Sequence, residues 1–158
     1  MKTMKHSYLI TLLIALSAVC HGTLSAKEIG IQSPDGRLKV NIELKDKIYY
    51  SVYSGDDLLL DNCSLGMTLV DEELGAQPKL RSMKRGEINE SVKREIPLKN
   101  AVVKNHCNTL RLNMAGNYAV EFRVFDNGVA YRFIIDKKGE VDVMGEDMIT
   151  VSYTHLTL

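Results

Sequence analysis

The sequence predicts an all-β protein built as an antiparallel sandwich, and three observations support this. The run Leu38–Leu44 alternates apolar and polar residues, the period-two pattern of a half-buried strand. The run Tyr118–Ile135 contains two more alternating segments around Asn127-Gly128, a dipeptide typical of tight β-hairpins. The chain after residue 26 shows no convincing helix. Because many short strands are joined by turns, two sheets packed face to face are expected.

The other strands are marked by short apolar or β-branched runs between turn residues. Pro34-Asp35-Gly36 is a turn with Pro and Gly in suitable places, and Gly55-Asp56-Asp57 is another. Residues 71–99 are polar and mixed in charge. We expect them to form a long loop that contains at most one short strand. The predicted strands before and after it are Glu28–Ser33, Leu38–Lys45, Ile48–Ser54, Leu58–Leu60, Leu65–Val70, Ala101–Lys104, Thr109–Met114, the two hairpin strands and Gly139–Ile149.

The hairpin register follows from the face that it buries. A two-residue loop at Asn127-Gly128 places six large apolar side chains on one face. The expected partners are Val124 with Tyr131, Phe122 with Phe133, and Val120 with Ile135.

On the other face, this register sets Arg123 opposite Arg132, an unfavourable pairing of like charges that Glu121, diagonal to Arg132, partly offsets. Either the two arginines fan apart in solvent, or they meet acidic groups of another sheet or domain.

Residues 1–26 have the composition of a secretory signal peptide. Lys2 and Lys5 precede an apolar run at Tyr8–Val19, which is too short to span a bilayer as a mature helix, and small residues follow. The expected location is therefore secreted, periplasmic or associated with an outer membrane. Cys20 raises the alternative of a lipid anchor, although Val19 before it fits a lipobox poorly; a cysteine discarded with the signal peptide is the simpler interpretation.

The charge balance after residue 26 argues against a nucleic-acid partner. There, 18 Lys and Arg face 20 Asp and Glu, a formal net charge of −2 without a basic tail. Binding to nucleic acid depends on clustered cations. Two cysteines, Cys63 and Cys107, remain in a compartment that permits disulfides. We expect two buried free thiols, with a Cys63–Cys107 bridge as the alternative.

The last eight residues, Val151–Leu158, look foreign to the domain. VSYTHLTL is the translation of a nucleotide string that resembles a sequencing-library adapter, so the natural protein is expected to continue beyond Thr150. The alternative is a genuine strand, since Val151, Tyr153 and His155 alternate acceptably.

No part of the sequence predicts a catalytic constellation. The acidic groups Asp56-Asp57, Asp71-Glu72-Glu73 and Glu146-Asp147 could in principle serve acid/base chemistry or bind a hard cation. Each lies in a polar or turn-like stretch without supporting ligand spacing, so solvated loop charge is expected. His106-Cys107 cannot share one metal ion, because adjacent strand residues point to opposite faces. We therefore predict no catalytic and no metal-binding residue here.

Several short segments occur along the chain in a recognisable order: Ser33–Val40, Tyr50–Val52, Leu58-Leu59, Ser64–Gly66, Lys104–His106 and Phe122–Phe133. Together they resemble the N-terminal domain of glycoside hydrolase family 97, which comprises secreted α-glucosidases and α-galactosidases typical of Bacteroidetes. The resemblance covers about residues 28–150. It departs from the family at Cys107-Asn108-Thr109, where an aromatic residue, Asn and an acidic residue are usual.

The resemblance implies a β-supersandwich of the galactose-mutarotase type, of which residues 27–150 form an incomplete part. It also implies a (β/α)₈ catalytic barrel, absent from this sequence, that holds the catalytic carboxylates and most calcium ligands. Calcium and an oligosaccharide substrate are thus expected in the parent protein, and this portion is expected to pack on the barrel without being active. The alternative is a non-enzymatic secreted β-sandwich that binds carbohydrate or a partner protein; the absence of Trp counts against it.

Overall fold

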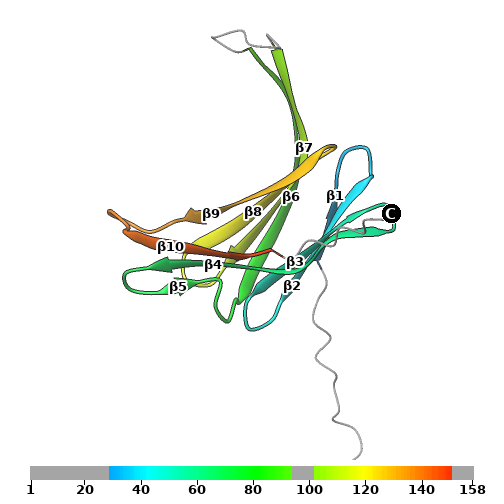
Figure 1. Ribbon diagram of the computed structural model, residues 1–158. Coiled ribbons are helices and arrows are strands. Elements are labelled where there is room, and N and C mark those ends of the chain that lie inside the picture. Colours follow the sequence, from blue (N-terminus) through cyan, green and yellow to red (C-terminus); the bar gives the residue numbers. More distant parts are fainter. Residues whose placement is uncertain (1–28, 94–101, 151–158) are drawn as a thin grey trace, which may run out of the picture.

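Alternating apolar residues and tight turns give rise to ten strands and no helix in the residues that the computed structural model describes, 29–93 and 102–150 (Figure 1). The strands are β1 (Ile29–Gln32), β2 (Leu38–Leu44), β3 (Ile48–Ser54), β4 (Asp57–Leu69), β5 (Glu73–Leu74), β6 (Leu80–Lys93), β7 (Val102–Met114), β8 (Tyr118–Phe125), β9 (Gly128–Ile135) and β10 (Val143–Ile149).

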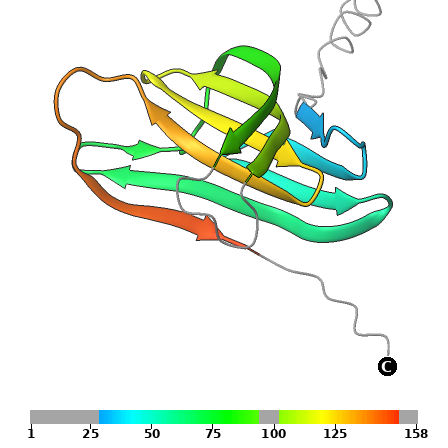
Figure 2. The ribbon, with the colours of Figure 1, turned by 90° about the horizontal axis from the view of Figure 1, so that it is seen from above.

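The strands form two antiparallel sheets, which confirms the predicted all-β sandwich. One sheet has the order β1-β2-β3-β4-β10, with the short β5 paired to β4. The other has the order β6-β7-β8-β9. Figure 2 shows the two sheets as separate layers, with β10 at one edge of the larger sheet.

The core lies between the sheets, and strands such as β2 and β8 contribute their alternate residues to it. Val40 and Ile42 of β2 are fully buried, as are Val120 and Phe122 of β8 on the facing sheet. The rings of Tyr50 and Phe122 meet across the interface with their centroids 6.0 Å apart. The period-two pattern therefore predicted the buried face of each of these strands correctly.

The hairpin register predicted from the sequence is wrong by two residues. Phe125 pairs with Gly128, so the loop is Asp126-Asn127, and Phe122 lies opposite Tyr131. Neither loop residue has the positive φ that a type I′ turn requires. Asp126 Oδ1 instead accepts a hydrogen bond at 3.0 Å from the backbone N–H of Asp35, in the β1–β2 turn. A shift of two residues leaves every side chain on the same face, so the six apolar residues still face the core.

This shift also overturns the predicted arginine pair. Arg123 lies opposite Ala130, and Arg132 lies opposite Glu121. Glu121 Oε1 is 2.9 Å from Arg123 Nε and 2.9 Å from Arg132 Nη2. One carboxylate therefore bridges the two guanidinium groups, where the prediction had two arginines in direct opposition.

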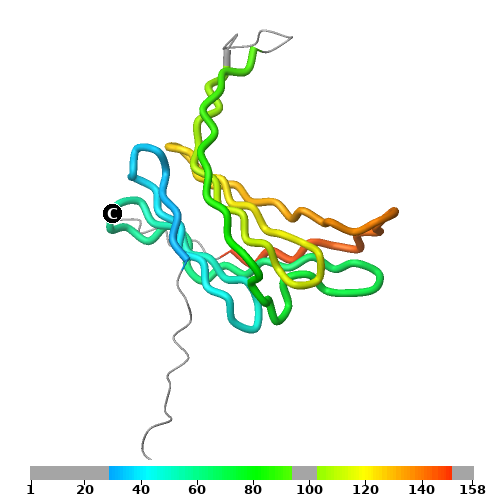
Figure 3. The backbone as a smooth tube through the Cα atoms, turned by 180° about the vertical axis from the view of Figure 1, so that it is seen from behind, coloured from blue at the N-terminus to red at the C-terminus, as the bar shows by residue number. Residues whose placement is uncertain are grey.

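Three further segments differ from the prediction. Residues 80–93, expected in a long polar loop, form the 14-residue strand β6 along β7. Leu58–Leu60 and the run predicted at Leu65–Val70, up to Leu69, belong to the single strand β4, which continues through Asn62 at φ 46° with register shifts typical of β-bulges. The two runs predicted within 101–114 likewise form one strand, β7. The distal parts of β6 and β7 project beyond both sheets as a two-stranded arm (Figure 3).

Cys63 and Cys107 are both free and buried, which confirms the expected thiols. The proposed signal peptide with Cys20, and the residues 151–158, lie outside the described residues. In the portion that the structure describes, no helix has the length and apolar character needed to cross a membrane.

The predicted turn at Pro34-Asp35-Gly36 is present and is organised by the Asp35 carboxylate. Gly36 adopts φ 75°. Asp35 accepts hydrogen bonds from Ser33 Oγ at 2.6 Å and from the backbone N–H and Nε of Arg37 at 3.0 and 2.5 Å. The Ser33 hydroxyl first, and then the Arg37 donors, hold the pKa of Asp35 well below its usual value of 3.8.

We expect Asp35→Asn to flatten the acid limb of the stability curve. Because the folded-state pKa is lowered, the contribution of Asp35 is fully present above about pH 5 and is lost as pH falls through the folded pKa. Urea midpoints measured at several pH values should fall more steeply on acidification for wild type than for Asp35→Asn. Asp56→Asn, in the exposed β3–β4 turn, is the matched control. Parallel curves for wild type and Asp35→Asn would contradict this assignment.

Candidate functional site

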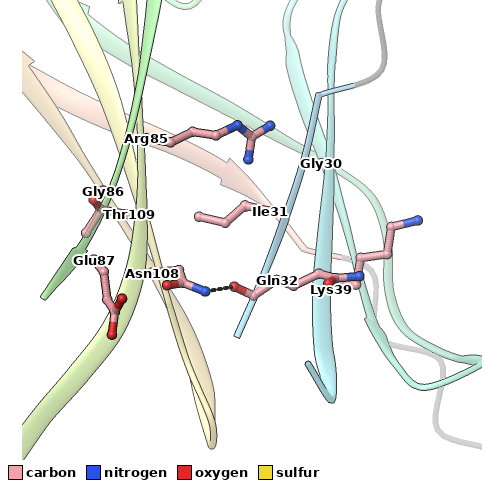
Figure 4. Close-up of a pocket in the computed structure, with 9 residues that line it drawn as sticks. All are labelled: Gly30, Ile31, Gln32, Lys39, Arg85, Gly86, Glu87, Asn108 and Thr109. Carbon is pink, nitrogen blue, oxygen red and sulfur yellow. Dashed lines mark hydrogen bonds between the residues drawn. The ribbon is translucent and has the colours of Figure 1, made fainter. Parts of the chain in front are cut away.

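One concave site in the described part of the chain is an open cleft of about 720 Å³ between the β1–β2 edge of one sheet and β6–β7 of the other. Figure 4 shows its lining, where the Asn108 side chain donates a hydrogen bond to the Gln32 carbonyl at 2.9 Å. The nine lining residues are mostly polar or glycine: Gly30, Ile31, Gln32, Lys39, Arg85, Gly86, Glu87, Asn108 and Thr109.

The charged groups of the cleft do not form an acid/base pair. Lys39 and Arg85 are cationic, and Glu87 is the single carboxylate among the lining residues. Glu87 Oε1 lies 3.0 Å from His106 Nε2, so this carboxylate already has a partner. Hydrolysis of a glycosidic bond ordinarily requires two carboxyl groups that flank it. The sequence does not predict this cleft, because β6, which supplies Arg85 and Glu87, lacks the alternating pattern that marks a strand.

The predicted acidic groups are not brought together. Asp56 and Asp57 are exposed at the β3–β4 turn. Glu72 pairs with Lys137, whereas Glu73 lies 3.5 Å from Lys47. Glu146, on β10, accepts a hydrogen bond from the hydroxyl of Tyr131 at 2.8 Å. Each carboxylate is thus engaged separately or exposed, as expected for structural and surface charge.

His106 and Cys107 point to opposite faces of β7, as predicted. His106 contacts Glu87, whereas Cys107 lies between Ile88 and Phe125 in the register of the three strands. Burial raises the pKa of the Cys107 thiol. A buried thiol held in its protonated form is a poor nucleophile.

The side chains that most often bind metal ions are not clustered in the described residues. Within residues 29–93 and 102–150, no group of three or more His, Cys, Asp or Glu side chains is placed to hold a metal ion.

The edge strand β10 exposes several large apolar side chains. β10 is an edge strand, and all seven of its residues are exposed. Its large apolar side chains are unusually accessible, with Met144 at 70% and Ile149 at 63%. An exposed apolar edge of this kind is typical of a surface that other protein covers.

Comparison with known proteins agrees with this architecture. The family model described as Glycosyl-hydrolase 97 N-terminal matches residues 31–151. A retaining alpha-galactosidase of Bacteroides thetaiotaomicron is 30% identical over 135 residues, which are 84% of this chain and 20% of that protein.

Solved structures share the fold. A glycoside hydrolase family 97 enzyme from Pseudoalteromonas sp. strain K8, in complex with acarbose, superposes with a TM-score of 0.67 at 21% identity over 76% of this chain. A beta-arabinopyranosidase superposes with a TM-score of 0.68 at 24% identity over 75% of this chain. The matched part is 20% of each of those chains, so this chain spans about a fifth of the length of its relatives. The chain belongs to glycoside hydrolase family 97 and represents its N-terminal domain.

Proposed function

We propose that this chain is the N-terminal, non-catalytic part of a secreted glycoside hydrolase that acts on α-glucosides or α-galactosides. The family match over residues 31–151 is the observation that carries the proposal. The similarity to a retaining alpha-galactosidase supports the substrate class. In this proposal the catalytic carboxylates and any calcium ion belong to a (β/α)₈ domain that follows, and a signal peptide at residues 1–26 directs export.

The described surface suits a supporting role for this domain. The described cleft offers a single carboxylate, Glu87, and the acidic groups singled out in the sequence are either engaged separately or exposed. The exposed apolar residues of β10 suit contact with further protein. A domain of this kind stabilises and orients its catalytic neighbour and leaves bond cleavage to it.

The test is a comparison of the full-length protein with residues 27–150 alone, using nitrophenyl α-glucoside and α-galactoside. We expect the full-length protein to hydrolyse at least one of the two substrates and the short form to hydrolyse neither. Hydrolysis by residues 27–150 alone would overturn the non-catalytic assignment. A full-length protein that cleaves neither substrate would favour a sandwich that binds carbohydrate or protein without catalysis.

A further inference from the structure

A row of charged side chains crosses all four strands on the outward face of the smaller sheet. The register places Lys84 of β6 opposite Arg111 of β7, and Arg111 opposite Glu121 of β8. Glu121 in turn lies opposite Arg132 of β9. On β7 and β8 the residues on either side of this row are buried in the core, so the row itself faces away from it. Arg123, two residues after Glu121, lies on the same face.

These five residues, Lys84, Arg111, Glu121, Arg123 and Arg132, form what we call the basic face. It carries four cations and one carboxylate, whereas the whole sequence has a formal net charge of zero. The Glu121 side chain is only 12% exposed and already contacts two guanidinium groups at 2.9 Å. The only carboxylate of the basic face is therefore fully engaged.

The two remaining cations lack such a partner. Arg111 donates from Nε to Asn113 Oδ1 at 2.9 Å, a neutral acceptor. Within the described residues, Lys84 and Arg111 form no ion pair. Like charges opposite each other on neighbouring strands are unfavourable, so this pair weakens the isolated sheet. A carboxylate from outside the sheet would remove that penalty.

We propose that the basic face docks against an acidic surface of another domain of the same full-length protein. This inference rests on the proposed function, which supplies a larger polypeptide, and relatives about five times as long as the matched part agree with it. Three of the four cations are arginines, whose planar fork matches a carboxylate in two hydrogen bonds. Arginine is also enriched at protein interfaces, where lysine is depleted.

The charge distribution favours protein over a polyanion. A nucleic-acid surface needs clustered cations on a basic domain, whereas this chain is neutral overall and the basic face contains a bound glutamate. A patch of arginines around one carboxylate is better suited to a few acidic side chains at defined positions.

The experiment is carbodiimide cross-linking of the full-length protein with mass spectrometry. We expect cross-links that join Lys84 to an Asp or Glu beyond residue 150. Their yield should fall by about threefold in 1 M salt, where the Debye length is only about 3 Å. The Lys45–Glu43 ion pair provides an internal positive control for the reaction. A clear Lys45–Glu43 product without any product from Lys84 to the rest of the protein would overturn the inference.

A charge-reversal variant gives a second measurement. Lys84→Glu places a carboxylate opposite Arg111, so the sheet by itself should not be weakened. Against an acidic neighbour the same change creates repulsion, and we expect protease cleavage between the domains to become about fivefold faster. Lys104→Glu makes the same charge change at an exposed position on the opposite face of the β6–β7 arm and should leave cleavage unchanged. Equal cleavage rates for the two variants would contradict docking.

The hydrolysis assay keeps the two proposals apart. An active full-length enzyme without Lys84 cross-links would refute docking by the basic face and leave the proposed function standing. Cross-links in a full-length protein that hydrolyses neither substrate would refute the proposed function and leave the docking surface standing.

Discussion

Replacing Phe122 by alanine is expected to lower the free energy of unfolding by about 3–5 kcal/mol, the range for removal of a buried aromatic side chain. Phe122 is fully buried in the middle of β8. Its ring lies 6.0 Å from Tyr50 and 6.3 Å from Tyr131, measured between centroids. Tyr50 belongs to the opposite sheet, so the substitution removes contacts that hold the two layers together. Neighbouring aromatic rings are too large to refill the space without leaving their rotamers.

Phe125→Ala is the matched control, since it removes the same side chain from the same strand. Phe125 is partly exposed and lies on the outward face, opposite Cys107 and Gly128. Its replacement should lower the free energy of unfolding much less than Phe122→Ala does, because Phe125 buries less apolar surface on folding. The comparison uses chemical denaturation monitored by tyrosine fluorescence. Equal losses for the two variants would show that Phe122 does not occupy the centre of the core.

The sequence predicted strands well wherever one face of a strand is buried. In β2 and β3, and in β8 apart from the buried Ala119, the buried side chains alternate with more accessible ones, and the large apolar residues of the sequence follow the same period. Burial of one face requires apolar residues at alternate positions of these strands. The sequence therefore predicted correctly which face of each strand is buried.

β6 shows why the same reasoning failed elsewhere. Its residues are exposed apart from Leu80 and Ile88, so neither face imposes an apolar pattern. It exists as a strand because it pairs with β7, the next strand along the chain, from Leu80–Met114 to Lys93–Val102, so its conformation depends on the partner strand and not on an apolar pattern of its own. The candidate cleft depends on β6, and for this reason no local signal pointed to Arg85 or Glu87.

The hairpin register shows a second limit. Registers that differ by two residues bury the same side chains, so the apolar pattern cannot distinguish them. The observed register places Glu121 opposite Arg132 and joins the turn to Asp35 through Asp126. Both interactions depend on distant residues or on the opposite strand. The sequence therefore predicted the buried face, whereas the arrangement of the outward charges required the structure.

Replacing Gly75 by alanine is expected to be nearly as damaging, although the sequence showed Gly75 only as a break in a polar stretch. Gly75 has φ 92°, a conformation that costs other residues about 1–3 kcal/mol. A Cβ atom would also lie 2.8 Å from the carbonyl oxygen of Leu65, in the centre of β4. Because that oxygen belongs to the backbone, the clash can be relieved only by moving a strand, which adds about 1–3 kcal/mol. The backbone N–H of Gly75 donates to the Tyr118 hydroxyl at 3.2 Å, so the movement would reach the other sheet.

Gly55→Ala separates the two contributions. Gly55 also has a positive φ, 59°, but a Cβ atom at this position would meet no other atom within 4 Å. That variant should therefore show the cost of backbone conformation alone, while Gly75→Ala shows this cost together with the steric clash. The difference between their urea midpoints measures how tightly β5 is held against β4. If Gly75→Ala costs no more than Gly55→Ala, the close approach to Leu65 does not constrain the fold, and the β4–β5 contact must be looser than its geometry implies.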